Sequence, residues 1–178
     1  MSGPLEFLAL KGLHKLDGTK TMGADADAPG NWLLAYWRAR RRPGVLPGRQ
    51  DIDPVDIRPD VLPNMYLMDV VPAQPRRRYR YRLIGTRMVE VAGADPTGRF
   101  VDEFVDPARV DEAHAWQDRT VDEPEAWLYS APLAFKHRDW TWAWRLSLPL
   151  ATDGKTVDML MLHFTLGARP PVGPTTVS

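Results

Sequence analysis

Residues Trp140 to Leu150 read Trp-Thr-Trp-Ala-Trp-Arg-Leu-Ser-Leu-Pro-Leu, and this alternation decides the class of fold. Three tryptophans and three leucines occupy one side of the stretch, and threonine, alanine, arginine and serine fall on the other. A period of two predicts a β-strand with one apolar face. The three indoles alone carry about as much apolar surface as the largest patch that a soluble monomer leaves exposed. Helices of the same chain, a ligand or a second subunit must therefore cover this face.

The overall composition describes one globular domain with extensions. Of the 178 residues, 44% are hydrophobic and 26% are charged, which is enough apolar material for one core. Lysine plus arginine and aspartate plus glutamate are 23 each, and the zero net charge argues against a basic nucleic-acid-binding domain. The absence of cysteine excludes disulfides, thiolate metal sites and thiol nucleophiles. No apolar run approaches the roughly 18–20 residues of a transmembrane helix, and the first residues lack the basic start of a signal peptide, so we predict a cytoplasmic protein.

The first 44 residues divide into a leader and a helix. Residues 1–30 are small and polar, which predicts a flexible leader with at most a short helix over residues 5–16. An N-terminal helix is predicted over residues 31–44, with Asn31 as its N-cap and an aromatic stripe along one side. Arginines crowd the C-terminal end of this helix, and a solvated helix end is favoured over a nucleic-acid contact.

Residues 45–168 are predicted to form the main domain, and residues 169–178 a Pro-rich tail. A segment with several prolines wraps the domain over residues 45–64. The predicted elements then follow in this order: strands 65–71 and 76–84, short helices 86–92 and 100–105, a longer helix 106–121, and a meander of strands 126–135, 140–150 and 156–166. Strand 76–84 alternates arginine with tyrosine, and an edge strand is favoured over an RNA-stacking surface. Strand 156–166 is apolar on both sides, which predicts a central strand covered on both faces.

The turns of the meander predict how its strands align. A two-residue turn at Asp153-Gly154 would pair Leu148 with Met159 and Trp144 with His163. A four-residue loop at 136–139 would pair Tyr129 with Leu146. The tryptophans would then share one face with Tyr129, Met161 and His163, and this aromatic face is predicted to be the main core. The reverse face, which carries Arg145, needs only partial cover, for which helix 31–42 of the same chain or of a second subunit is the candidate.

The order of elements resembles a PAS domain, and in particular the short stand-alone PAS proteins common in proteobacteria. The resemblance covers residues 31–168 and rests on these stretches: Asp51-Ile-Asp-Pro54, Asp56-Ile57, Leu62-Pro63, Leu67-Met-Asp-Val70, Tyr79-Arg-Tyr-Arg-Leu-Ile-Gly-Thr86, Thr97-Gly98, Leu148-Pro-Leu150, Asp153-Gly154 and Val157-Asp-Met159. It implies an α+β fold, with a five-stranded antiparallel sheet, short helices on one face, and an N-terminal helix that often supports dimers.

Cofactor chemistry is tested residue by residue. Flavin photochemistry of the adduct-forming type needs a cysteine, and the chain has none. Haem-binding PAS domains use a histidine that often lies on the long helix, where His114 lies, but its acidic neighbours favour a solvent-facing side chain. His163 is expected in the core as a packing residue or a ligand contact, and His137 in a solvated loop. No metal-ligand spacing, phosphate loop or nucleophile motif is present in the sequence, so no catalytic residue is predicted and the cofactor stays open.

We expect a non-enzymatic sensory or regulatory module that binds a small apolar or aromatic molecule between the sheet and the helices. The candidate ligand-binding residues are Tyr81, Met88, Trp116, Tyr129, Trp144, Met161 and His163. The alternative is a ligand-free interaction module of the same fold. The expected partners are a second copy of the chain, bound through helix 31–42, and a separate output protein. A cavity of about 300 Å³ or more beside His163 would favour ligand binding, and a close-packed core would favour the interaction module.

Overall fold

A computed structural model describes residues 13–18, 20, 22, 28–132 and 142–167. Within these residues the chain forms one antiparallel sheet of strand order β1-β4-β5-β6-β2-β3. The strands are β1 His14–Lys15, β2 Met65–Val71, β3 Arg78–Ile84, β4 Trp127–Pro132, β5 Trp142–Leu150 and β6 Met159–Gly167. The helices are α2 Ala28–Arg40, α3 Thr86–Ala92, α4 Val101–Phe104 and α5 Val110–Asp122, with single 3-10 turns η1 to η4 at Arg49–Asp51, Pro54–Asp56, Leu62–Asn64 and Pro107–Arg109. The expected α+β fold is confirmed, with two-residue β1 as a sixth strand.

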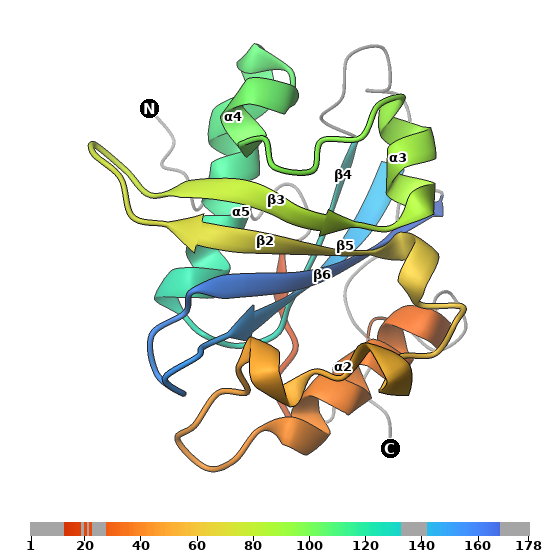
Figure 1. Cartoon of the computed structure of the whole chain (residues 1–178), viewed down its shortest axis with the longest axis vertical. Coiled ribbons are helices and arrows are strands. Elements are labelled where there is room, and N and C mark those ends of the chain that lie inside the picture. The colour runs from red at the N-terminus through yellow and green to blue at the C-terminus, as the bar shows by residue number, and fades with distance from the viewer. Residues whose placement is uncertain (1–12, 19, 21, 23–27, 133–141, 168–178) are drawn as a thin grey trace.

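Helices cover the sheet on both faces (Figure 1). Helix α2 packs on β5 and β6 from one side, and α4 and α5 contact β3 and β5 from the other. Strand β6 lies in the middle of the sheet and is buried on both faces over Met159–Phe164. This confirms the prediction of a central strand. We call the two sides the α2 face and the α5 face.

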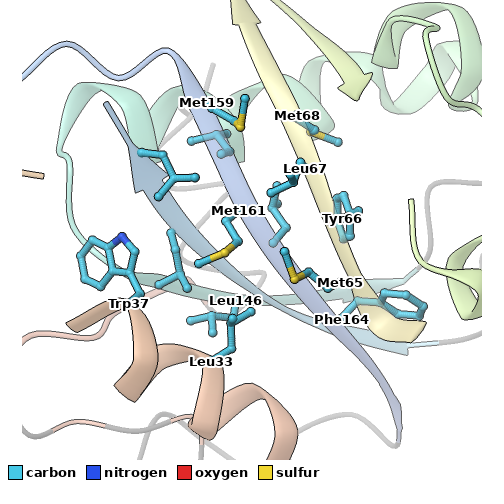
Figure 2. Close-up of a cluster of buried hydrophobic side chains, with 14 of the residues drawn as sticks. Leu33, Trp37, Met65, Tyr66, Leu67, Met68, Leu146, Met159, Met161 and Phe164 are labelled. Atoms are coloured by element: carbon cyan, nitrogen blue, oxygen red, sulfur yellow. The ribbon is translucent and has the colours of Figure 1, made fainter. Parts of the chain in front are cut away.

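The α2 face holds a closely packed apolar core. Leu33 and Trp37 of α2 lie against Leu146 and Met161 of the sheet, and all four are buried (Figure 2). The indole Nε1 of Trp37 donates a hydrogen bond to the main-chain oxygen of Pro149 at 2.9 Å. The prediction that helix 31–42 covers the face carrying Arg145 is wrong: α2 covers the opposite face, with Leu146 and Met161, and α5 covers the face of Arg145.

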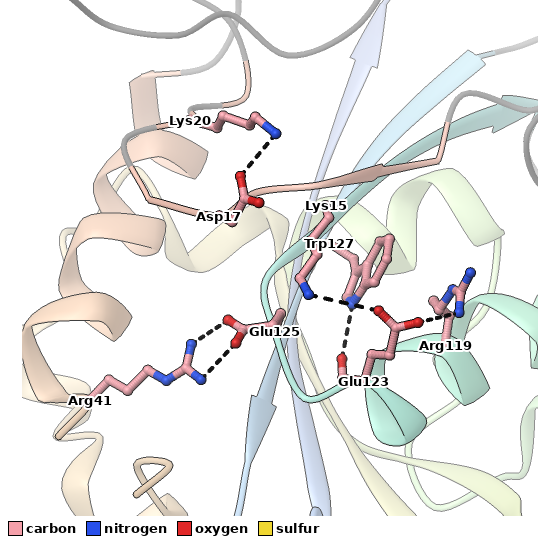
Figure 3. Close-up of polar contacts among 8 residues, drawn as sticks. All are labelled: Lys15, Asp17, Lys20, Arg41, Arg119, Glu123, Glu125 and Trp127. Carbon is pink, nitrogen blue, oxygen red and sulfur yellow. Dashed lines mark hydrogen bonds and ion pairs between the residues drawn. The ribbon is translucent and has the colours of Figure 1, made fainter. Parts of the chain in front are cut away.

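Helix α2 begins and ends earlier than predicted. It starts at Ala28, so Asn31 lies inside the first turn rather than at the N-cap, and its side chain accepts a hydrogen bond from the main-chain nitrogen of Met22. Its basic end is not a solvated surface. Arg38 donates to the main-chain oxygens of Leu16 and Lys20, and Arg41 forms an ion pair with Glu125 (Figure 3).

Part of the predicted leader belongs to the fold. His14 and Lys15 pair with β4 rather than continuing a helix, and Leu16 and Met22 are buried in the core. Lys15 also lies 3.8 Å from the carboxylate of Glu123, at the end of α5 (Figure 3). The prediction of an unstructured leader is therefore wrong for these residues. Residues 1–12 and the Pro-rich tail lie outside the described residues.

The register of the meander differs from the prediction at both connections. Tyr129 pairs with Arg145 rather than with Leu146, and this one-residue difference moves Tyr129 to the opposite face from Trp142 and Trp144. The predicted four-residue loop lies within residues 133–141, outside the described residues. On the other side, Leu148 pairs with Met161, a two-residue shift that leaves the faces unchanged. That shift arises because residues 151–158 form a long connection that bonds to residues 46 and 47 of the wrapping segment instead of turning at once.

Other elements agree with the sequence closely. Strand β2 and helix α3 have the predicted bounds, and Gly93 ends α3 at a φ of 77°, a conformation that glycine adopts without strain. The N-cap of α3 is Gly85. The long helix starts later than predicted: Asp106 accepts a bond from the main-chain nitrogen of Ala108 and caps the 3-10 turn η4, and α5 begins at Val110.

Strand β3 is an edge strand, as predicted, but its arginines are paired. Arg78 contacts Asp102 and Glu103 at 2.9 Å, and both Arg80 and Arg82 contact Asp69 on the neighbouring strand. The intervening Tyr79 and Tyr81 point into the core and are buried. Acidic partners from β2 and α4 therefore neutralise much of the basic strand.

Candidate ligand-binding site

A small cavity lies on the α5 face, between the sheet and α3, α4 and α5. Its volume is about 30 Å³. Its wall consists of side chains from four strands and three helices: Tyr66, Met68, Tyr81, Met88, Val101, Val105, Ala113, Trp116, Gln117, Tyr129 and Arg145. This volume has room for one or two water molecules and is well below the roughly 300–1,000 Å³ of a site for a drug-sized ligand.

Aromatic rings form much of this wall. Trp116 of α5 and Tyr129 of β4 lie with ring centroids 4.2 Å apart, and Tyr66 and Tyr81 lie 6.5 Å apart. Burial raises the pKa of the hydroxyls of Tyr66, Tyr81 and Tyr129. The phenols are therefore protonated at neutral pH, and each keeps a hydroxyl that can donate a hydrogen bond.

Arg145 brings a positive charge to this aromatic wall. Strand alternation places it on the α5 face, next to Tyr129, where the side chain is only 6% exposed. Its guanidinium carbon lies 5.4 Å from the ring centroid of Trp116 and 5.8 Å from that of Tyr129. Among the described residues, no carboxylate lies within ion-pair distance of this guanidinium. A buried charge without a counter-charge destabilises the folded state, so Arg145 lowers the stability of the protein at this site.

Further polar atoms on the same wall lack hydrogen-bond partners in the part of the chain that the structure describes. They are the indole Nε1 of Trp116, Oε1 of Gln117, the hydroxyl of Tyr129 and Nη1 of Arg145, of which Tyr129 and Arg145 still interact with the nearby hydroxyl of Tyr66. The other amide atom of Gln117, Nε2, lies 3.9 Å from the sulfur of Met68, which is a weak acceptor. Buried polar atoms are satisfied in most native proteins, so four such atoms around one cavity indicate a site that water or a ligand completes.

The family of the chain follows from comparison with known proteins. A family model described as PAS domain matches residues 26–162, which is most of the chain. The chain belongs to the PAS domain family. PAS domains are generally sensory or interaction modules rather than enzymes, so the family indicates a sensory or regulatory role. A search of curated proteins found no match.

The PAS domain brings four of the seven predicted site residues together. Tyr81, Met88, Trp116 and Tyr129 all line the cavity. The other three, Trp144, Met161 and His163, lie on the α2 face and do not line this cavity. The predicted residues divide between two faces because the register between β4 and β5 pairs Tyr129 with Arg145, on the opposite face of the sheet from Trp144.

The sequence analysis missed three polar residues of the PAS domain site: Arg145, Gln117 and Tyr66. Arg145 had a recognisable signal, because an arginine within an otherwise apolar strand is seldom found in a core without a role. It was instead assigned to a face that needs only partial cover.

His114 is buried in the PAS domain, at 1% exposure, and the prediction of a solvent-facing side chain is wrong. Its ring packs edge-on against Tyr79 at 5.4 Å, and neither ring nitrogen has a hydrogen-bond partner among the described residues. Burial, followed by the nearby charge of Arg76, lowers its pKa. His114 is not among the residues that line the cavity.

A second hollow lies at the surface of the PAS domain, between the end of α2 and the connection from β5 to β6. It encloses about 190 Å³ and is more open than the internal cavity. Two of the charged groups around it are already engaged: Arg40 bonds to Asp56 and to the main-chain oxygen of Asp51, and Asp153 accepts bonds from the next residues of its own turn. The internal cavity, with its unsatisfied atoms, is therefore the stronger candidate site.

The described residues contain neither a helix long and apolar enough to cross a membrane nor a group of three or more potential metal ligands.

Proposed function

We propose that this PAS domain is a non-enzymatic sensory module whose internal cavity accepts a small molecule, and that occupancy is passed on through protein contacts. The observation that carries the proposal is the set of unpartnered buried polar atoms around one cavity. Leaving a buried polar atom unsatisfied costs about 1–3 kcal/mol. A ligand that satisfies several of them at once would stabilise the folded state and select one arrangement of α5 against the sheet.

The route by which occupancy would act runs through β5. Arg145 reaches the cavity, and the next residue, Leu146, packs against α2 on the opposite face. A shift of the β5 backbone on ligand binding would therefore change the position of α2 on the sheet. A partner that binds at α2 would sense the state of the cavity without touching the ligand.

Thermal-shift screening of a metabolite library tests the proposal. Compounds that enter the cavity should raise the melting temperature of the wild type, because they bind the native state only. Ala113 lines the cavity, and Ala113→Leu should fill it and abolish these shifts. Ala108→Leu, at an exposed position before α5, is the matched control and should respond like the wild type. The proposal fails if no compound produces a shift, or if Ala113→Leu responds to the same compounds equally.

The second candidate function is a ligand-free interaction module that dimerises through α2. The small volume of the cavity and the close contact of Trp116 with Tyr129 favour it, because little space is left to fill. The apolar side of α2 is already used inside the chain, so such a dimer would have to use its outer side, where half-buried Trp32 stacks on Tyr36 at 5.0 Å. Sedimentation velocity over a range of concentrations, with Trp32→Ala as the variant, would detect this dimer.

A further inference from the structure

We infer that the ligand of the internal cavity is a small monovalent anion, a carboxylate or an inorganic oxyanion, bound by Arg145. The inference rests on the proposed function and names the chemical class of the molecule that this site takes. It departs from the apolar or aromatic ligand expected from the sequence, because the composition of the wall was wrongly predicted.

The first argument is charge. Other arginines in the described fold have acidic partners, among them Arg78 with Asp102 at 2.9 Å and Arg109 with Glu112 at 3.0 Å. Arg145 is more deeply buried than Arg78, and the described residues offer it aromatic rings and the hydroxyl of Tyr66 but no carboxylate. An arginine cannot lose its proton at any ordinary pH, so it cannot escape the cost of burial by becoming neutral. An anion in the cavity would remove that cost.

The second argument is the polarity of the unsatisfied atoms. Nη1 of Arg145 and Nε1 of Trp116 are donors only, and the protonated hydroxyl of Tyr129 can also donate. The fourth atom, Oε1 of Gln117, exchanges place with Nε2 when the amide rotates by half a turn, which would present a further donor. The site is therefore rich in donors and calls for a ligand rich in acceptors. The flat guanidinium fork matches a carboxylate or another planar oxyanion.

The third argument is size. A cavity of about 30 Å³ admits an anion no larger than formate, acetate or nitrate while its walls stay in place. Two of the wall residues, Met68 and Met88, have flexible side chains that could move for a slightly larger group. The size of the cavity, which argues against a drug-sized metabolite, is thus compatible with a small anion.

Acetate and acetamide are the discriminating pair of probes, because they have nearly the same shape and differ in charge. Each is titrated to about 100 mM, since a ligand of four heavy atoms can bind only weakly, and ionic strength is balanced with gluconate, which is too large for the cavity. Formate, nitrate and chloride are titrated in parallel. The readouts are the melting temperature and the ¹H–¹⁵N signal of the Trp116 indole, which reports on the cavity directly.

The expected result is a saturable shift of the Trp116 signal and a rise in melting temperature with acetate or nitrate, and neither with acetamide. Arg145→Met should lose both responses and melt at a higher temperature than the wild type in gluconate alone. Arg87→Met, which removes an exposed charge paired with Glu90 on α3, should keep both. Response to acetate and formate alone identifies a carboxylate site, and response to nitrate alone identifies a site for an inorganic oxyanion. Response to chloride alone would contradict the inference.

The inference is overturned if no anion moves the Trp116 signal of the wild type, a measurement that does not depend on the stability of any variant. It is also overturned if Arg145→Met keeps the anion response. If no anion moves the Trp116 signal, but neutral compounds from the library bind the wild type and do not bind Ala113→Leu, the inference is wrong and the proposed function stands. If neither the anions nor the library compounds bind, the inference and the proposed function are both wrong.

Discussion

The two faces of the sheet are built from different materials. On the α2 face, Leu33 and Trp37 meet leucine and methionine side chains, and the buried groups are almost all apolar (Figure 2). On the α5 face, tyrosines, a glutamine and an arginine surround a cavity. The α2 face therefore stabilises the fold by burying apolar side chains. The α5 face stabilises it less, because it buries polar groups close together.

This division separates two tasks that a small domain usually combines. The α2 face holds the sheet and the N-terminal helix together regardless of any ligand. The α5 face is left with unsatisfied atoms, and such sites are more often functional than structural. The adjacent residues Arg145 and Leu146 project to opposite faces, so the comparison can be tested one residue at a time.

The largest effect is expected at Leu146, which is fully buried on the α2 face. Leu146→Ala should lower the free energy of unfolding by about 2–5 kcal/mol, because it removes apolar contacts and leaves a cavity. Arg145→Met, one residue earlier, should have the opposite sign and raise it by about 1–4 kcal/mol in an anion-free buffer, by analogy with the replacement of buried charges by apolar groups. Urea denaturation measures both. If the two substitutions destabilise the protein equally, the two faces do not differ in the way described.

A smaller effect is expected from a satisfied polar pair on the α5 face. The hydroxyl of Thr120 lies 2.9 Å from that of Ser147 and 3.3 Å from the main-chain oxygen of Trp116, and both side chains are fully buried. Thr120→Val leaves the Ser147 hydroxyl without a partner and should cost about 1–3 kcal/mol. Ser147→Ala should cost less, because Thr120 can still donate to the main-chain oxygen. In urea denaturation the double variant should resemble Ser147→Ala. Additive costs would instead show that the two hydroxyls act independently.

The elements of this fold were predictable from the sequence because their signals are local. Strand β2 and helix α3 were found with their observed bounds, since alternation and helical periodicity end at a proline or glycine. The central position of β6 followed from its apolar residues on both sides. The family followed from the order of these elements and from scattered turn residues.

The site was only half predictable, because it depends on register and on which helix covers which face. Tyr81, Met88, Trp116 and Tyr129 were found because each belongs to a buried stripe of its own element. Met161, His163 and Trp144 lie on the other face from this cavity, since the parity of the β4–β5 connection decides which side chains share a face. Arg145 was overlooked because it was assigned to a face that contains polar residues, and that face was predicted to need only partial cover.

A pH effect is expected from His114, which the α5 face buries against Tyr79. Burial lowers its pKa in the folded state below the usual value of 6.5, so the unfolded state takes up the proton first. The stabilisation from the neutral form is complete above about pH 6.5 and is lost as pH falls below it, at up to about 1.4 kcal/mol per pH unit. His114→Phe should remove this slope in denaturation series at successive pH values. His14→Gln, at a less buried histidine of β1, should leave most of it, and an unchanged slope in His114→Phe would assign the effect to other groups.

The smallest effect is expected from the ion pair between Arg41, just after α2, and Glu125, just before β4 (Figure 3). Both side chains are about one-third exposed, so Glu125→Gln should cost at most about 1 kcal/mol at neutral pH. The hydrogen bonds from Arg41 hold the pKa of Glu125 below its usual 4.5. The stabilisation is therefore present above about pH 4.5 and disappears as pH falls through the lowered pKa.

Denaturation of the wild type and Glu125→Gln at successive pH values measures this pair, and the difference between them should vanish in acid. Arg41 also lies 5.3 Å from the ring of Trp37, so Arg41→Gln should cost somewhat more than Glu125→Gln and should keep part of its cost in acid. If the cost of Glu125→Gln persists in acid, the carboxyl group contributes through packing instead of charge. If that cost exceeds the cost of Leu146→Ala, then α2 is held mainly by its polar end, and the apolar contacts of the α2 face are not what secures it.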